Sequence, residues 1–388
     1  MSSQIYRALA LTAVAASATL AAGCGTAAPP ASRQATRAAP LAPSLNTALV
    51  TTAGTWAIAV MGGRSARHND FWQLFIRPAG STRWKLVTPP GTADNGGLVL
   101  ASGGRSLIAA FRPSQNLTFT PLTRTGTGGQ AWSSLSPVTA PLASAPDALA
   151  MNPASGRLLA LLASGAAAQA VPGYSRWAAV TSQRALAATA SGRRCGLRAL
   201  TAATFTPSGT PLLGGSCAHP GTAGIFADDH GTWQVTGPAI PAALARQDIA
   251  VLRLTQTSQQ TVALLAAGSG RAARLLAAWS TDSGGHWALS PPLPLNGAAV
   301  TSTSFGAAGA AAVVLTGNRG EIITRAGSHW QTLPALPPGT VTLAAGPGAI
   351  SALAVHRARL TIWQPSPRGA TWLTAQTIDV PIQFGSSG

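Results

Sequence analysis

Seven tryptophans recur along the sequence at nearly regular intervals, and this period constrains the fold more than any other feature. They are Trp84, Trp132, Trp177, Trp233, Trp287, Trp330 and Trp372. Successive members are separated by 48, 45, 56, 54, 43 and 42 residues. A period of roughly 40 to 50 residues is typical of folds in which small sheets repeat around an axis. The region from Leu45 to Gly388 allows about 49 residues for each of seven repeats.

Short apolar runs separated by Gly, Pro, Ser and Asn fill the intervals between these tryptophans. Two intervals show a fourfold division, into 98–101, 107–111, 117–122 and 132–135, and into 341–345, 350–355, 360–363 and 372–377. Many runs are apolar on both faces, as expected where sheets stack radially. The pattern predicts an all-β chain, a seven-bladed β-propeller of four-stranded antiparallel blades over residues 45–388.

Two other repeat architectures fit the sequence less well. A parallel β-helix has shorter repeats, and the 42 glycines and 29 prolines would break nearly every helix of a helical solenoid. Propellers generally complete the last blade with a strand from the other terminus. Either 45–50 or 380–384 could supply that strand.

The segment Ser280–Trp287 has the pattern S-x-D-x-G-x-x-W, which resembles the Asp-box of sialidase-like propellers. The resemblance implies that the Ser280 and Asp282 side chains form hydrogen bonds to the backbone of a hairpin turn. It also implies that Gly284 has a positive φ and that Trp287 packs between sheets. Partly decayed copies precede the other six tryptophans, and 125–132 is the best preserved of them. In this repeat and in its richness in arginine, the chain is similar to the photosystem assembly factors, which are seven-bladed propellers. The similarity implies that the chain binds another protein.

The first 44 residues predict export and a lipid anchor. Residues 1–23 have one basic residue followed by a run rich in Ala and Leu, which is typical of a signal peptide. The run ends at Leu20-Ala21-Ala22-Gly23-Cys24, which resembles a lipobox, although a large aliphatic residue is usual at the position of Ala21. We expect lipidation of Cys24, a tether over 24–44 rich in Ala and Pro, and a location on the outer face of the cytoplasmic membrane. The alternative is ordinary secretory cleavage with Cys24 as a free thiol.

The charge balance is strongly basic. The chain has 26 basic and nine acidic residues, a formal net charge of +17, and Lys85 is its only lysine. The excess of Arg, Ala, Gly and Pro resembles proteins of a GC-rich genome such as that of an actinobacterium. The arginines are scattered singly, which argues against nucleic acid as a partner, while the overall field favours anionic partners such as phospholipid headgroups or wall polymers.

The two cysteines of the predicted propeller, Cys195 and Cys217, are 22 residues apart. We expect them near the first strand of the fourth blade and near the end of its second strand, which are neighbours in one hairpin. In an oxidising compartment this spacing favours a disulfide over free thiols, with a contribution on the order of 3 kcal/mol. Two polar clusters contain side chains that could coordinate a cation, Asp228-Asp229-His230 and Arg67-His68-Asn69-Asp70. We interpret both as turns and expect neither a metal nor a cofactor.

Catalysis is not expected. Sialidases use a tyrosine nucleophile assisted by a glutamate, and outside the leader this chain has only Tyr174 and Glu321. Tyr174 falls in a predicted outer turn, and the nine acidic residues form no evident glycosidase pair. Two binding functions remain open for a monomeric propeller: an assembly scaffold for another exported protein, or a lectin-like binder of anionic wall glycopolymers.

Overall fold

The computed structural model describes residues 46–62, 70–89, 98–111, 122–135, 146–218, 221–325, 329–347 and 349–381. The chain divides into two compact units, Met1–Arg37 and Ala38–Gly388, and every described residue belongs to the second. The predicted signal peptide, the tether with Cys24 and the loop residues 67–69 lie outside the described residues. No described helix is long and apolar enough to cross a membrane.

The described strands group into seven consecutive antiparallel meanders of four strands each. The first contains β1 (Asn46–Thr51), β2 (Gly54–Gly62), β3 (Asp70–Pro78) and β4 (Lys85–Leu86). The second contains β5 (Leu98–Gly103), β6 (Ser106–Phe111), β7 (Leu122–Thr125) and β8 (Ser133–Leu135). The third contains β9 (Ala148–Met151), β10 (Leu158–Leu161), β11 (Ala166–Ala170) and β12 (Trp177–Ser182).

The same order continues through the rest of the chain. The fourth meander contains β13 (Leu197–Phe205), β14 (Pro211–Cys217), β15 (Gly224–Asp229) and β16 (Thr232–Val235). The fifth contains β17 (Ile249–Gln256), β18 (Thr261–Ala267), β19 (Arg274–Ser280) and β20 (Ala288–Leu289), with β21 (Leu293–Pro294) also on β19. The sixth contains β22 (Val300–Phe305), β23 (Ala311–Leu315), β24 (Arg319–Ile323) and β25 (Gln331–Thr332). The seventh contains β26 (Thr340–Gly346), β27 (Ala349–His356), β28 (Arg359–Pro365) and β29 (Trp372–Asp379).

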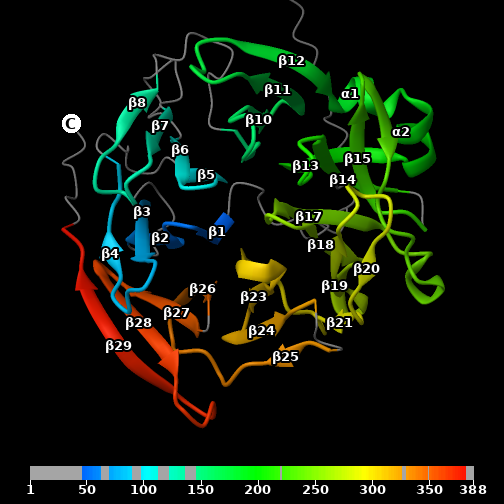
Figure 1. Ribbon diagram of the computed structural model, residues 1–388. Helices are drawn as coiled ribbons and strands as arrows, with labels where there is room; N and C mark the ends of the chain where they lie inside the picture. The colour runs from blue at the N-terminus through cyan, green and yellow to red at the C-terminus, as the bar shows by residue number, and fades with distance from the viewer. Residues whose placement is uncertain are drawn as a thin grey trace, which may run out of the picture. The chain divides into compact units, whose positions relative to one another are not determined.

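The meanders stand around a common axis with their first strands innermost (Figure 1). Seven buried apolar clusters hold them together, and each cluster joins two adjacent meanders. One of these clusters joins the first meander to the seventh, through Phe75 and Trp84 on one side and Leu353 and Leu360 on the other. The predicted β-propeller of four-stranded antiparallel blades is therefore confirmed.

Most strands lie where the sequence predicts them. Of the run 117–122, predicted as the third strand of the second meander, only Leu122 is described, at the start of β7, and residues 117–121 lie outside the described residues. Two short helices, α1 (Gln183–Ala187) and α2 (Ala190–Cys195), link the third and fourth meanders. Hydroxyl caps start both helices, because Ser182 accepts from the Ala185 amide and Thr189 from the Gly192 amide.

Among the described strands, neither end of the chain adds a strand to the meander at the other end. The seventh meander takes all four of its strands from the C-terminal part of the chain, and β1 is the innermost strand of the first meander. β1 additionally pairs in parallel with β22 of the sixth meander. The expected exchange of a terminal strand is thus absent from the described strands, and side-chain packing closes the ring.

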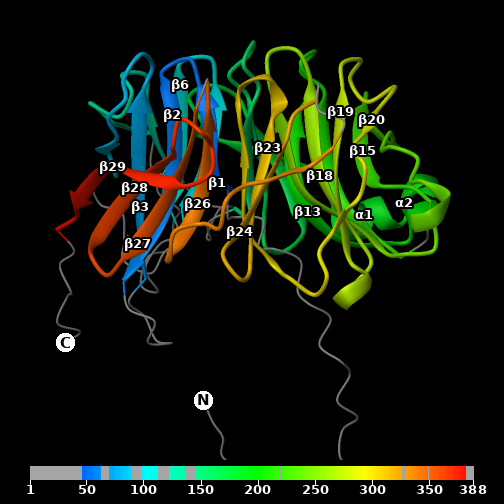
Figure 2. The ribbon, with the colours of Figure 1, turned by 90° about the horizontal axis from the view of Figure 1, so that it is seen from below.

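Every meander runs between two rims of the ring, as the side view shows (Figure 2). We call the proximal rim the end at which the first strand of each meander begins, and antiparallel pairing places the turn between the second and third strands there too. The distal rim carries the turns between the first and second strands and between the third and fourth. Since β1 begins at Asn46, the preceding chain joins the ring at the proximal rim.

Candidate functional site

The seven repeated tryptophans occupy one structural position. Each lies within one residue of the start of the fourth strand of its meander. Four of the indole N–H groups donate to a backbone carbonyl of the preceding meander: Trp132 to Val87 at 3.1 Å, Trp287 to Thr236 at 2.6 Å, Trp330 to Pro291 at 3.0 Å, and Trp372 to Pro334 at 3.2 Å. The accepting carbonyl lies three or four residues after the tryptophan of its own meander. These four tryptophans therefore link adjacent blades through their indole N–H groups.

The turn that precedes Trp287 is closed by its own side chains. Ser280 Oγ donates to Asp282 Oδ1 at 2.9 Å and accepts from the Gly284 amide at 2.8 Å, and Asp282 Oδ1 also accepts from the His286 amide at 2.8 Å. Gly284 has a φ of 96°, which favours glycine. Hydrogen bonds from the His286 backbone and imidazole hold the pKa of Asp282 well below its usual range.

The turn at 125–132 repeats this geometry with hydroxyl groups. Thr125 Oγ1 accepts from the Gly129 amide at 3.0 Å, and Thr127 Oγ1 accepts from the Ala131 amide at 2.9 Å. Thr127 therefore does with a hydroxyl what Asp282 does with a carboxylate. Both turns have structural roles on the distal rim.

Tyr174 and Glu321, the tyrosine and glutamate that a sialidase mechanism would need, lie in different meanders. Tyr174 is in the outer turn of the third meander, 5% exposed, and its hydroxyl donates to the Gly156 carbonyl at 2.8 Å. Burial raises the pKa of this phenol. Glu321 is in β24 of the sixth meander, 2% exposed, and accepts from the Thr332 hydroxyl at 2.9 and 3.1 Å. Each is bound by its own meander, and the structure does not bring them together.

The cluster at 228–230 is a hairpin tip. Asp228 accepts from the Gly231 amide at 2.8 Å, and the exposed Asp229 and His230 contact each other at 2.9 Å. Within the described ranges, no three His, Cys, Asp or Glu side chains are grouped so that they could hold a metal ion. Of the second cluster weighed as a metal site, only the backbone of Asp70 is described, in β3.

Cys195 and Cys217 form a disulfide with a Cα–Cα distance of 5.1 Å. Cys217 ends β14, and Cys195 ends α2 just before β13, close to the first strand of the fourth meander as the sequence predicts. Register pairing of Leu197 with Cys217 explains how the two come together. The bond ties the helical link to the fourth meander.

Two arginines are buried in the ring. Arg253 in β17 is 2% exposed and donates to the Leu252 carbonyl at 2.8 Å, and burial lowers its pKa to about 9. Arg77 in β3 is 7% exposed, lies 5.9 Å from the centre of the Trp84 ring, and has its pKa lowered by burial. Neither arginine lines the pocket described next.

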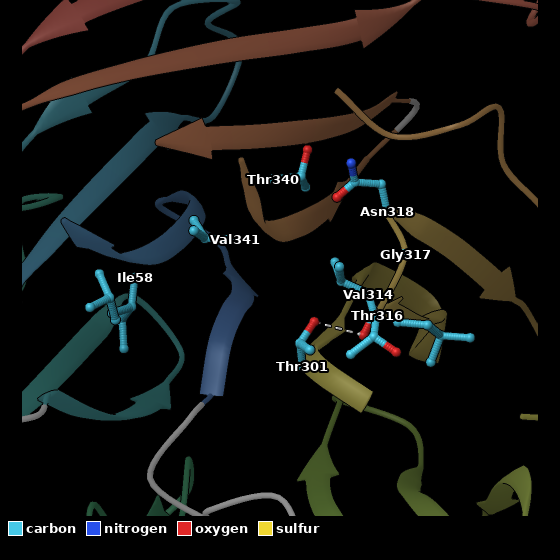
Figure 3. A pocket seen from close by; sticks show the side chains of 10 residues that line it. Ile58, Thr301, Val314, Thr316, Gly317, Asn318, Thr340 and Val341 are labelled. Atoms are coloured by element: carbon cyan, nitrogen blue, oxygen red, sulfur yellow. Dashed lines mark hydrogen bonds between the residues drawn. The ribbon is translucent and has the colours of Figure 1, made fainter. Parts of the chain in front are cut away.

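A pocket of about 350 Å³ lies at the proximal rim, where the sixth, seventh and first meanders meet. Its walls come from the proximal parts of β2, β22, β23 and β26 and from the turn after β23. Figure 3 shows Ile58 and Val341 on one side and Thr301, Val314 and Thr316 on the other. Thr301 Oγ1 donates to the Val314 carbonyl at 3.1 Å, which fixes one polar group of the wall.

The lining is apolar with neutral polar groups. Its polar side chains belong to Thr301, Thr316, Thr340 and Asn318, and its ten residues include no charged and no aromatic side chain. Such a pocket can exclude water from small apolar groups and can bind amides through hydroxyl and amide side chains. It offers no acid, base or nucleophile pair.

Solved structures share this fold. A protein from Lactobacillus plantarum matches with a TM-score of 0.52 at 11% identity, over 83% of this chain and 95% of its own. Prolyl endopeptidase matches with a TM-score of 0.50 at 12% identity over 88% of this chain, which spans about half (51%) of that protein. YCF48 bound to a D1 peptide matches with a TM-score of 0.45 at 14% identity, over 79% of this chain and 90% of its own. At these identities the first two matches show the fold alone.

No protein-family model and no curated protein matches the sequence. The pocket was missed by sequence reasoning because its lining residues are ordinary threonines, valines and leucines from strand ends of three separate meanders. No local pattern marks them. Only the ring, which brings residue 58 beside residues 301–341, creates the pocket.

Proposed function

We propose that this chain is an exported, lipid-anchored propeller that acts as a non-catalytic scaffold for another protein at the cell envelope. The observation that carries the proposal is the composition of the proximal pocket. It is large enough for one or two small apolar side chains of a peptide, and hydroxyl groups of its lining can bind the peptide backbone.

The lining of the pocket also favours one of the two binding functions, protein scaffold or glycopolymer binder, that the sequence leaves open. A glycan site is expected to stack sugars on exposed aromatic rings, and an anionic glycopolymer is expected to meet cations. The proximal pocket is lined by neither, and the repeated tryptophans pack between blades. A polypeptide segment with small apolar side chains therefore fits the pocket better than an anionic wall polymer.

Site-specific photo-crosslinking in native envelopes tests the protein partner. A photoreactive residue at the exposed Thr316 of the pocket is expected to give one discrete adduct, and the same group at the exposed Ser155 of the distal rim serves as the control. Val341→Arg in the pocket wall should abolish the Thr316 adduct. Adducts of equal identity and yield from both positions, or a Thr316 adduct that survives Val341→Arg, would contradict the proposal.

The lipid anchor has its own test. Cys24→Ser is expected to release the protein from the membrane fraction into the medium, because the acyl chains are its proposed anchor. Metabolic labelling with an alkyne fatty acid should mark the wild-type chain and not the variant. Retention of Cys24→Ser in a high-salt-washed membrane fraction would refute the anchor.

A further inference from the structure

Exposed arginines concentrate on the proximal rim, from the α1–α2 link through the fourth and fifth meanders. Six contribute, and all six are exposed: Arg184, Arg193, Arg194, Arg198, Arg246 and Arg271. Asp248 is the one acidic residue that the structure describes on this part of the rim, and it pairs with Arg198 at 3.4 Å. We call these six arginines the basic rim.

Hydrogen bonds join the segments that carry the basic rim. Gln183 Nε2 donates to the Arg198 carbonyl at 2.5 Å, and the Arg193 guanidinium donates to the Ala188 carbonyl at the end of α1. The Gly268 amide, at the turn before Arg271, donates to the Asp248 carbonyl at 2.8 Å. The arginines are therefore held on one connected framework that includes α1, α2 and the disulfide.

The chain also joins the ring on this side. β1 begins at Asn46 on the proximal rim, and 21 residues separate it from Cys24. A segment of this length spans at most about 75 Å when fully extended. A lipid on Cys24 would keep the ring close to the membrane without fixing which rim faces it, so a further contact is needed to orient the ring.

We infer that the basic rim docks on anionic phospholipid headgroups and turns the proximal pocket toward the membrane. The inference rests on the proposed lipid anchor, which brings the rim to the bilayer. Guanidinium groups bind phosphate through several N–H donors, and arginines near an anionic leaflet attract it over about a Debye length. The partner that the pocket fits would then be a membrane-proximal segment of an integral membrane protein.

The test uses the non-lipidated Cys24→Ser protein and vesicles of phosphatidylcholine with or without one-third phosphatidylglycerol. We expect co-sedimentation with the anionic vesicles only, weakened by salt. The triple variant Arg184→Glu, Arg246→Glu, Arg271→Glu should lose roughly tenfold or more in affinity. The matched control, Arg105→Glu, Arg157→Glu, Arg176→Glu, changes the net charge equally at exposed distal positions and should lose much less.

A second measurement keeps the test valid if a triple variant fails to fold. An environment-sensitive dye on Ser269→Cys of the proximal rim should shift to the blue on anionic vesicles, and the same dye on the distal Ser155→Cys should not. Equal losses from both triple variants, or equal dye shifts, would overturn the inference, because they indicate a non-oriented charge effect. Rim-dependent binding to a soluble poly(glycerol phosphate) without binding to vesicles would also overturn it. The vesicle experiments use a protein without a lipid anchor. A negative result would therefore overturn the orientation of the ring and would leave the proposed lipid anchor on Cys24 to its own test.

Discussion

The junction that closes the ring differs from the junctions inside it. At four internal junctions a tryptophan indole donates to a carbonyl of the preceding meander. At the closure, the Gln376 side chain of the seventh meander instead forms two hydrogen bonds with the backbone of Trp84. The Trp84 amide donates to Gln376 Oε1 at 2.8 Å, and Gln376 Nε2 donates to the Trp84 carbonyl at 2.9 Å. The Trp84 indole N–H is buried and has no hydrogen-bond partner among the described residues, as is also the case for Trp177 at an internal junction.

This difference follows from covalent continuity. Adjacent internal meanders are joined by the chain, whereas the described parts of the first and seventh meanders meet through side-chain hydrogen bonds and packing. The buried Arg77 also packs at this junction, and a Cβ on Gly346 would collide with its guanidinium. We infer that the closure, where no chain connection joins the two meanders, depends more on its specific side chains than the internal junctions do, and that it opens first when the ring is stressed.

Trp84→Ala should have the largest effect. The indole is 2% exposed in the closing cluster, and truncation of such a side chain costs about 3 to 5 kcal/mol of unfolding free energy. Trp330→Ala, at an internal junction where the ring is partly exposed, should cost clearly less. Urea unfolding followed by far-UV circular dichroism measures both. Equal losses would show that the closure is no more sensitive than an internal junction.

Gln376→Ala should come next. It removes two hydrogen bonds to half-buried backbone groups, which is expected to cost about 1 to 3 kcal/mol. The exposed Gln331 is a matched control, and Gln331→Ala should change stability little. Amide hydrogen exchange adds a spatial readout, since Gln376→Ala should speed exchange in β3 and β28 before it does so in β18. A uniform increase over all blades would contradict preferential opening at the closure.

Sequence reasoning found the ring and missed its closure for one physical reason. Strands and turns are local, so the turn residues at 125–132 and 280–287 could be recognised from a few neighbouring residues. The tryptophan period follows because this local pattern recurs along the chain. Gln376 and Trp84 are 292 residues apart, and neither has a local pattern that points to the other. The proximal pocket is non-local in the same way, because Ile58 meets Val314 and Val341 only in the closed ring. The α1–α2 link was missed because an Ala-rich stretch with isolated Ser and Thr carries only weak capping signals.

Trp330→Phe isolates the hydrogen bond of an internal junction. It keeps an aromatic ring but removes the donor to the Pro291 carbonyl, and the bond lies in an exposed setting. We expect a loss of about 0.5 to 1.5 kcal/mol in urea unfolding, below that of Gln376→Ala. A loss as large as that of Trp330→Ala would mean that the indole N–H, not the packing of the ring, holds the junction.

Acid should weaken the internal junction between the fourth and fifth meanders without affecting the closure directly. Asp282 fixes the turn that positions Trp287, and its pKa is lower in the folded state than in the unfolded state. The stability that its ionised carboxylate contributes is therefore fully present above the unfolded pKa of about 4 and is lost as the pH falls toward the folded pKa. Gln376 does not titrate. The difference in unfolding free energy between wild type and Asp282→Ala should shrink between pH 6 and pH 3, while the difference between wild type and Gln376→Ala stays constant. If the difference in unfolding free energy between wild type and Asp282→Ala stayed constant over this range, the charge of the carboxylate would not stabilise the turn. Ser280 and Gly284 would then close it without that charge, as hydroxyl groups do in the turn at 125–132.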